Sequence, residues 1–306
     1  MAMGIYEWCT FMSLVLWIAI YERNIDGSLV YMDDNFGFDV DRQLVHYSPY
    51  DKFMPQKQAR LLCLWDELRI PHKEEKQLFG EQLTIIGFSV DTVSMVISLP
   101  TEANAQLVSA IRDFVKGADR RYQRLRDWQR ILGWINWGLN VCPLLRPALQ
   151  SSYDKVAGRQ LPLAPIYLNK GTSHDLLWIA DMFERNEGVH LLTSKVWRPE
   201  DADIVIYCDA CLSGLGFWTP TLSPGYAFAT NRPPAPRQVE DNMFWYEAIT
   251  VLAALEWAVA KSPSFHRVAI FTDNLNTVQM FDSFRSREPY LNILSLRASP
   301  NVPGRR

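Results

Sequence analysis

The sequence lacks three features that would each indicate a particular class of protein. It has no excess of basic charge, because the net charge over 306 residues is −3 and the pI is about 6.0. This argues against nucleic-acid binding through overall positive charge and leaves a local basic face open. Its five cysteines are an odd, mostly scattered set without a paired framework, which favours a reduced, intracellular protein in the cytoplasm or nucleus. It also has no internal repeat or low-complexity run.

A long hydrophobic run near the start of the chain is also missing. The apolar stretch over residues 8–20 is too short to span a bilayer. It has no positive leader, since Glu7 is the only charged side chain before it. We therefore expect no membrane partner.

The composition is that of a folded protein. Hydrophobic residues make up 48% and charged residues 21%, and the length is sufficient for two or three modules.

Residues 29–38 predict a strand, a tight turn and a second strand, because apolar residues flank Asp33 and Asp34, and Asn35 and Gly37 tolerate turn geometry. Two adjacent ionised carboxylates repel each other unless solvent or a cation compensates. For oxygen ligands that cation is Mg²⁺ or Mn²⁺. The alternative is that both are ordinary solvated turn residues.

The string Tyr-Met-Asp-Asp at 31–34 on an apolar strand resembles the palm-domain active site of reverse transcriptases. The resemblance implies that Asp33 and Asp34 are catalytic and that Asp33 binds metal. It also implies a helix before the hairpin. Residues 9–24 predict that helix, with a buried stripe formed by Phe11, Leu14, Val15 and Ile18.

The stretch 76–91 predicts a strand interrupted at Gly87 by a kink or a close backbone approach. At this distance after the hairpin it is similar to the motif D lysine and primer grip of the same family. The resemblance implies that Lys76, Gly87 and Phe88 contact nucleic acid.

Residues 101–137 predict two helices separated near Gly117. Seven basic residues stand against three acidic ones between Arg112 and Arg130. Such a run is either a solvated helix face or a surface that follows a phosphate backbone. Its position after a palm-like motif resembles the family's thumb, and we name the expected contact set: Arg112, Lys116, Arg120, Arg121 and Arg124.

A second set of carboxylates begins after Asp203. An apolar strand reaches Asp209, a hairpin follows, a helix over about 243–261 contains Glu247, and a further strand reaches Asp273. This order can bring three carboxylates to one end of a sheet, where they can hold two divalent ions. Each acid alone has another interpretation, since Glu247 suits a helix start and Asp273 a strand end.

The segments Tyr-Cys-Asp-Ala, Trp-Tyr-Glu-Ala and Phe-Thr-Asp-Asn resemble the ribonuclease H domain of retroelements. The resemblance implies that Asp209, Glu247 and Asp273 bind Mg²⁺ or Mn²⁺ and catalyse cleavage of RNA in RNA–DNA hybrids. Cys208 and Cys211 enclose Asp209, but no second Cys/His pair accompanies them, so we interpret them as packing residues.

Together the motifs resemble a retroelement reverse transcriptase–ribonuclease H polyprotein of the retrotransposon or pararetrovirus type. The expected fold is α+β: a partial polymerase palm over 1–99, a helical thumb and connection over 100–200, and an α/β ribonuclease H-like domain with a mixed sheet over 201–306. The expected partners are an RNA–DNA hybrid or primer-template and other parts of the same polyprotein.

The departures from the family pattern limit the expected activity. No Asp precedes Asp26 and no carboxylate follows Glu288, so we expect the further palm Asp and the fourth ribonuclease H Asp to be missing. We expect no polymerase activity from this chain alone. Three hypotheses remain: a polymerase fragment with ribonuclease H activity, an inactive remnant that binds nucleic acid, and an unrelated structural protein.

Overall fold

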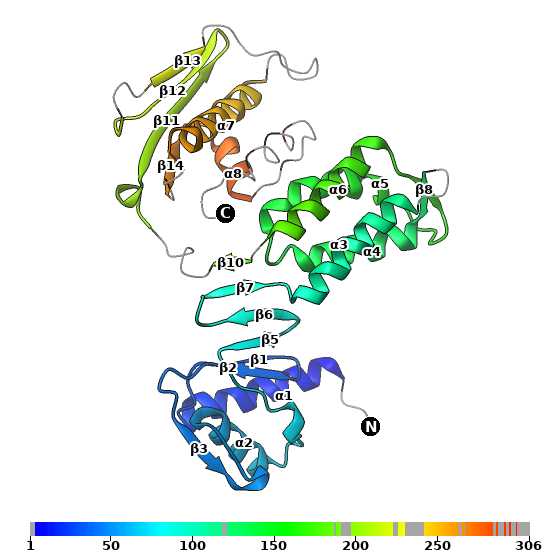
Figure 1. Cartoon of the computed structure of the whole chain (residues 1–306), viewed down its shortest axis with the longest axis vertical. Helices are drawn as coiled ribbons and strands as arrows, with labels where there is room; N and C mark the ends of the chain where they lie inside the picture. Colours follow the sequence, from blue (N-terminus) through cyan, green and yellow to red (C-terminus); the bar gives the residue numbers. More distant parts are fainter. Residues whose placement is uncertain are drawn as a thin grey trace. The chain divides into compact units, whose positions relative to one another are not determined.

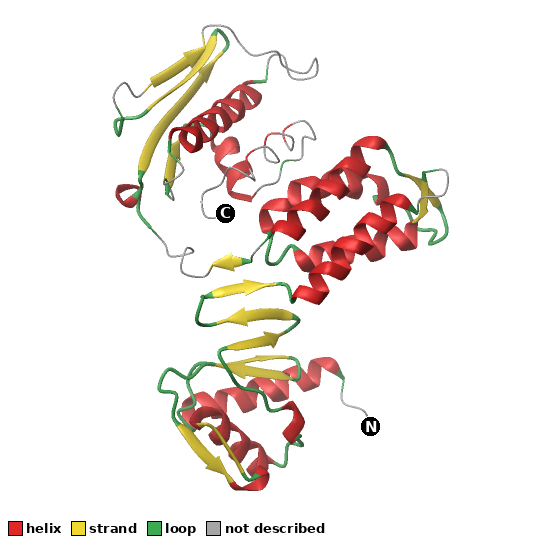
Figure 2. Ribbon diagram, viewed as in Figure 1, coloured by secondary structure: helices red, strands yellow, loops and turns green. Residues whose placement is uncertain are grey.

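The fold is known from a computed structural model, which describes residues 4–117, 121–186, 188–190, 197–222, 226–229, 242–262, 265, 267–283, 286, 291, 294 and 298. It is an α+β fold of helices and small sheets, and one of the sheets is mixed, as the sequence predicts (Figure 2). The chain forms two compact units, Met1–Ser94 and Met95–Arg306. The predicted boundary at residue 200 stays a prediction.

The first unit combines helices with short hairpins (Figure 1). Its elements are α1 (Ile5–Trp17), η1 (Ile18–Glu22), β1 (Ser28–Tyr31), β2 (Asp34–Gly37), β3 (Leu44–Tyr47), η2 (Ser48–Tyr50), β4 (Lys52–Pro55), α2 (Gln56–Leu68), η3 (Glu74–Lys76), β5 (Gln82–Ile85) and β6 (Phe88–Asp91).

The core of this unit lies between α1, α2 and the β3–β4 hairpin. Met12 and Val15 pack with residues of these elements, and Ala19 packs with Leu64 of α2. The predicted helix is present, but its predicted buried stripe is partly wrong, because Phe11 and Leu14 are exposed. Apolar residues surround α1 on all sides, so helical spacing alone did not identify the packed face.

The β5–β6 hairpin corrects the interpretation of Gly87. Ile85 pairs with Phe88, so Ile86 and Gly87 form a two-residue turn and do not kink a continuous strand. Both turn residues have positive φ, 50° and 81°, which matches the right-handed twist of the two strands.

The second unit begins with helices and short strand pairs. Its elements are β7 (Val96–Ser98), α3 (Thr101–Lys116), β8 (Tyr122–Arg124), α4 (Leu125–Gly138), η4 (Pro143–Leu149), α5 (Gln150–Val156), β9 (Pro165–Tyr167), α6 (Lys170–Arg185), β10 (Val189–His190) and η6 (Pro199–Asp201). The two helices predicted within 101–137 are confirmed as α3 and α4. The strand β8, which precedes α4, was not predicted.

The mixed sheet comprises four strands in the order β13–β12–β11–β14. The elements are β11 (Ile204–Cys211), β12 (Gly214–Trp218), β13 (Tyr226–Ala229), α7 (Met243–Lys261), β14 (Val268–Phe271) and α8 (Leu275–Ser283). The pairs β11–β12 and β12–β13 are antiparallel, whereas β11 and β14 are parallel. Helix α7 lies against this sheet (Figure 1), where Ile204, Ile206 and Cys208 pack against Val251 and Ala254.

Helix α7 is also the one helix, among the described residues, that is long and apolar enough to cross a membrane. More than half of its most apolar window is buried inside the protein. Its apolar character is therefore accounted for by its position in the core.

Gly138 at the end of α4 lies where α4 packs against Leu107 of α3 and Phe183 of α6. A Cβ at this position would lie 2.8 Å from the ring of Phe183 and 3.0 Å from Leu107. We expect Gly138→Ala to lower the free energy of unfolding by about 1–3 kcal/mol because the crowded core must shift. Gly133→Ala in the same helix is the control, since its Cβ meets nothing within 4 Å. We expect Gly133→Ala to raise the free energy of unfolding, measured by urea denaturation, by up to about 1 kcal/mol. Similar effects of the two substitutions would contradict the packing described.

Candidate functional site

Asp209 extends from the exposed face of β11. Residues alternate along this strand, so Ile206, Cys208 and Ala210 face the core while Asp209 faces outward. The pairing with β14 ends at Tyr207 and Phe271, so Asp209 lies beyond the last paired residue of β14. On its β14 side, β11 therefore has no paired residue of β14 at the level of Asp209, whereas on its other side Asp209 pairs with Gly216 of β12.

Glu247 and Asp273 come from two other elements. Helix α7 begins after Asn242, whose side-chain oxygen accepts a 3.0 Å hydrogen bond from the Phe244 amide, and Glu247 follows about one turn later. Its side chain is buried, with the residue only 4% exposed. Asp273 is exposed and follows the end of β14 by two residues.

These three side chains meet at one place. One carboxylate oxygen from each of Asp209, Glu247 and Asp273 lies within 4.8 Å of the other two. The sequence order of strand, helix and strand therefore brings together the three carboxylates that the sequence predicts for the second site. Among the described residues, no other group of three or more histidine, cysteine or acidic side chains is close enough to hold an ion.

The electrostatics of the cluster centre on Glu247. Burial raises the pKa of its carboxyl above the usual value, and the negative charges of Asp273 and Asp209 raise it further. Opposing this, the Thr272 hydroxyl donates a 3.3 Å hydrogen bond to Oε2 of Glu247. Three close oxygen donors with a surplus of negative charge fit Mg²⁺ or Mn²⁺, which both prefer carboxylate oxygen. Asp209, Glu247 and Asp273 would be the ligands.

Thr272 is a residue that sequence reasoning missed. It connects the end of β14 to the buried carboxylate, and its place directly before Asp273 was the available signal. The two neighbouring cysteines are free and separate: Cys208 is buried, whereas Cys211 is exposed beside Ser213. Burial raises the pKa of the Cys208 thiol to about 12.

The first predicted site has a different geometry. The hairpin of β1 and β2 is confirmed, but its turn is formed by Met32 and Asp33, because Tyr31 pairs with Asp34. The prediction that Asn35 and Gly37 form the turn is wrong, since both lie within β2. Gly37 instead permits a close backbone approach, because a Cβ there would lie 2.9 Å from the Gly27 carbonyl oxygen.

Asp33 and Asp34 are therefore near neighbours at the hairpin, and both are exposed. No third carboxylate among the described residues joins them in a group suited to a metal. The structure thus brings together three of the five predicted catalytic residues, and leaves these two as a separate pair whose role stays a prediction.

The remaining predicted contacts are scattered over several elements. Lys76 is exposed at the end of η3, Gly87 is in the β5–β6 turn, and Phe88 begins β6 and is half-buried. Lys116 is exposed at the end of α3. Arg120 lies outside the described residues.

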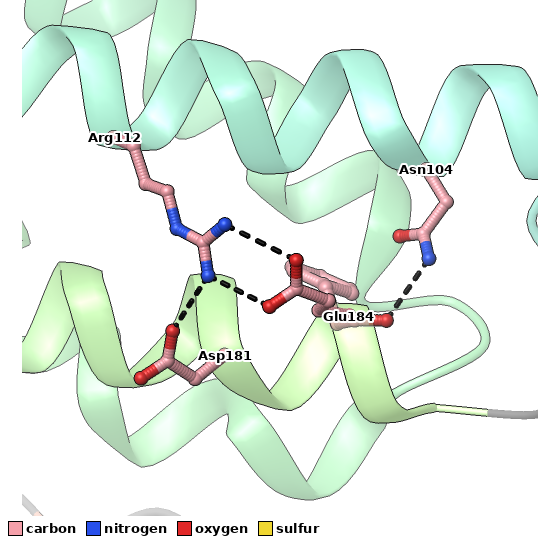
Figure 3. A network of polar contacts seen from close by, with 5 residues as sticks. Asn104, Arg112, Asp181 and Glu184 are labelled. Carbon is pink, nitrogen blue, oxygen red and sulfur yellow. Dashed lines mark hydrogen bonds and ion pairs between the residues drawn. The ribbon is translucent and has the colours of Figure 1, made fainter.

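Arg112 has partners within the protein. Its guanidinium donates to Asp181 at 2.8 Å and to Glu184 at 2.7 Å and 3.2 Å, which joins α3 to α6 (Figure 3). Glu184 and Asp181 hold the pKa of the guanidinium above its usual value. Close by, the Asn104 side chain donates to the Phe183 carbonyl oxygen at 2.9 Å. Arg112 is therefore already engaged in the packing of α3 against α6.

Comparisons with known proteins give similarity in structure only. No family model and no curated protein matches the chain. Among solved structures, a foamy viral protease-reverse transcriptase dRH in complex with double-stranded DNA is 16% identical, with a TM-score of 0.44, over 97% of this chain and 48% of that one. The same kind of protein with an RNA/DNA hybrid is 16% identical, with a TM-score of 0.41, over 95% of this chain and 37% of that one. The chain thus spans about half or less of these proteins.

The raised pKa of Glu247 predicts a pH-dependent response to metal. A carboxyl that binds its proton more tightly when folded costs stability as the pH rises from its unfolded pKa through its folded pKa. Added Mg²⁺ should offset that cost, so we expect it to raise the melting temperature at neutral pH and much less near pH 4.

The matched variants are Glu247→Gln and Asp282→Asn, the latter an exposed carboxylate of α8. Glu247→Gln should stabilise the metal-free protein at neutral pH and reduce the Mg²⁺ response in thermal melting. Asp282→Asn should leave the response unchanged. An Mg²⁺ shift of the same size in the wild type and in Glu247→Gln would contradict this account of the cluster.

Proposed function

We propose that the module around the mixed sheet hydrolyses the RNA strand of an RNA–DNA hybrid, as the ribonuclease H-like part of an RNA-directed DNA polymerase of retroelement type. The observation that supports it best is the convergence of Asp209, Glu247 and Asp273 from three separate segments. The sequence motifs around these residues indicate an RNA–DNA hybrid as the substrate. The three clustered carboxylates are suited to bind the metal ions that hydrolysis needs.

The chemistry divides between the bound ions and the protein. When bound, a pair of Mg²⁺ ions lowers the pKa of an attacking water and stabilises the leaving oxygen of a phosphodiester. Asp209 and Asp273 are exposed and present their carboxylates at the surface, where a phosphate backbone can approach. Glu247 is buried and holds the inner side of the site.

Thr272 acts on this arrangement as a positioning residue. Its hydroxyl holds one oxygen of Glu247 and favours the ionised form of that carboxyl. An ionised Glu247 beside two further carboxylates is a ligand for a cation, whereas a protonated one is not. The hydrogen bond thus supports the charge state that metal binding needs.

For the hairpin of Asp33 and Asp34 we propose a palm-like origin without independent polymerase activity. Among the described residues, no third carboxylate groups with this pair closely enough to hold a metal ion. A two-metal site needs ligands from more than this one hairpin. The alternative for the whole chain is a catalytically inactive retroelement remnant that binds nucleic acid. The two proposals differ in one observable, Mg²⁺-dependent cleavage of the hybrid.

Substitution of Asp273 tests the proposed cleavage. We expect Asp273→Asn to reduce hybrid cleavage by more than about 100-fold, because loss of a ligand exceeds the 10–100-fold typical of an outer-shell change. Thr272→Val should reduce it by about 10–100-fold and Thr272→Ser should restore it. Asp282→Asn should cleave like the wild type. If Asp273→Asn keeps full activity, the site assignment is wrong.

The assay uses purified full chain, Mg²⁺ and a labelled RNA strand annealed to a shorter, separately labelled DNA primer, with nucleotides present. We expect shortened RNA and an unextended primer on one gel. Hybrid binding without cleavage would favour the inactive remnant. Absence of hybrid binding would favour the unrelated structural protein, and an extended primer would contradict our proposal for the hairpin.

A further inference from the structure

Strands β8 and β9 form a two-stranded ribbon that the sequence did not predict. Tyr122 pairs with Tyr167, Gln123 with Ile166, and Arg124 with Pro165. Because side chains alternate, Gln123 and Ile166 face the helices, whereas Tyr122, Arg124 and Tyr167 face outward.

The inward face of the ribbon is firmly anchored. Ile166 is only 4% exposed, and the Gln123 side chain donates a 2.6 Å hydrogen bond to the Phe114 carbonyl oxygen of α3. The Leu168 amide donates to the Arg121 carbonyl oxygen at 2.7 Å. The outward side chains therefore project from a backbone that is held in place before any ligand arrives.

The outward face combines aromatic rings with cations. Tyr122 is 47% exposed and Tyr167 is 41% exposed, and their ring centroids are 5.4 Å apart. The Lys155 ammonium lies 5.8 Å from the Tyr167 ring centroid. The Arg121 guanidinium donates to the Tyr167 hydroxyl at 3.5 Å. Tyr167 thus has both Tyr122 and Lys155 beside its ring, and Tyr122 is the more exposed of the two tyrosines.

The cations of this face differ from Arg112 in their partners. Within the described part of the chain, Arg121, Arg124 and Lys155 form no ion pair with a carboxylate, whereas Arg112 forms two. Three positive charges beside two exposed rings are complementary to a polyanion that also offers planar groups. Nucleic acid has both properties, since its phosphates are anionic and every base has a π-face.

We propose that the β8–β9 ribbon binds a single-stranded segment of RNA or DNA, with a base stacked on Tyr122 and the neighbouring phosphates on Arg121 and Arg124. Its biological setting rests on the proposed nucleic-acid function, but the binding itself does not need the carboxylate cluster. A single strand is favoured over a duplex because its bases are free to stack on a side chain.

The test measures binding by fluorescence anisotropy with full chain in EDTA, which keeps the metal site out of the experiment. The probes are labelled 12-nucleotide oligouridine, oligothymidine of the same length, and a DNA duplex. We expect both single strands to bind several-fold more tightly than the duplex. Tighter binding of oligouridine than of oligothymidine would indicate RNA as the natural ligand, and the reverse would indicate DNA.

Two sets of variants separate stacking from charge. Tyr122→Ala should weaken single-strand binding by about 5–100-fold, the range expected for one stacked base, while Tyr122→Phe retains it. The double variant Arg121→Asn, Arg124→Gln should reduce the slope of log affinity against log salt by about 0.7 for each lost phosphate contact. Asn suits position 121 because Arg121 has φ of 68°.

The matched controls are Tyr6→Ala, which removes a ring that is 87% exposed, and Arg198→Gln, which removes an exposed arginine. Both should bind like the wild type. Wild-type affinity in Tyr122→Ala, an unchanged salt slope in the arginine double variant, equal or better duplex binding, or no binding by the wild type would each overturn the proposal.

The outcome is separable from that of the cleavage assay. Asp273→Asn should bind single strands like the wild type, because the ribbon shares no residue with the cluster. Ribbon-dependent binding without cleavage would contradict the proposed hydrolysis alone, and cleavage without ribbon-dependent binding would contradict the ribbon proposal alone.

Discussion

The parallel pairing of β11 with β14 is the constraint on which the candidate site depends. Parallel strands have their carboxyl ends at the same edge of a sheet, so Asp209 and Asp273 are brought to one edge although they are far apart in sequence. A parallel pair also requires a crossover, and α7 is part of that connection. Packing of α7 on the sheet then delivers Glu247 to the same edge. Topology, and not local sequence, makes the three carboxylates neighbours.

The position of Glu247 lowers the stability of the fold while it serves the proposed metal site. Ile206, Cys208 and Val251 bury apolar surface beneath the sheet and favour the fold. The same packing forces a buried Glu247 toward two other negative groups, which raises its pKa and costs stability when it ionises. A structure that only needed to fold would gain from an amide or an apolar residue there. The cost is consistent with a site that binds a cation, since the cation removes it.

The sequence predicted the elements of the mixed sheet and the three acids on or beside them, because these elements are strongly patterned. Asp209 lies near the end of β11, Glu247 near the start of α7, and Asp273 two residues after β14. It also predicted helices α3 and α4. The errors came where pattern is ambiguous. Helix α1 has apolar residues on every side, so its packed face of Met12 and Val15 followed from tertiary contacts. The Ile86–Gly87 turn was not predicted, because the apolar residues on both sides of it have the pattern of one continuous strand.

The basic stretch shows why residue counts do not identify a binding surface. Arg112 and Arg124 belong to the same run of positive charge, and no feature of the local sequence distinguishes them. Folding places Asp181 and Glu184 of α6 against Arg112, which donates three hydrogen bonds to them, and places Arg124 on the outward face of a ribbon beside Tyr122. The two partners of Arg112 are 69 and 72 residues away in sequence, so the local charge pattern does not indicate them. A cation is available to a polyanion where folding leaves it without a carboxylate partner, and at the ribbon such cations also lie beside two exposed aromatic rings.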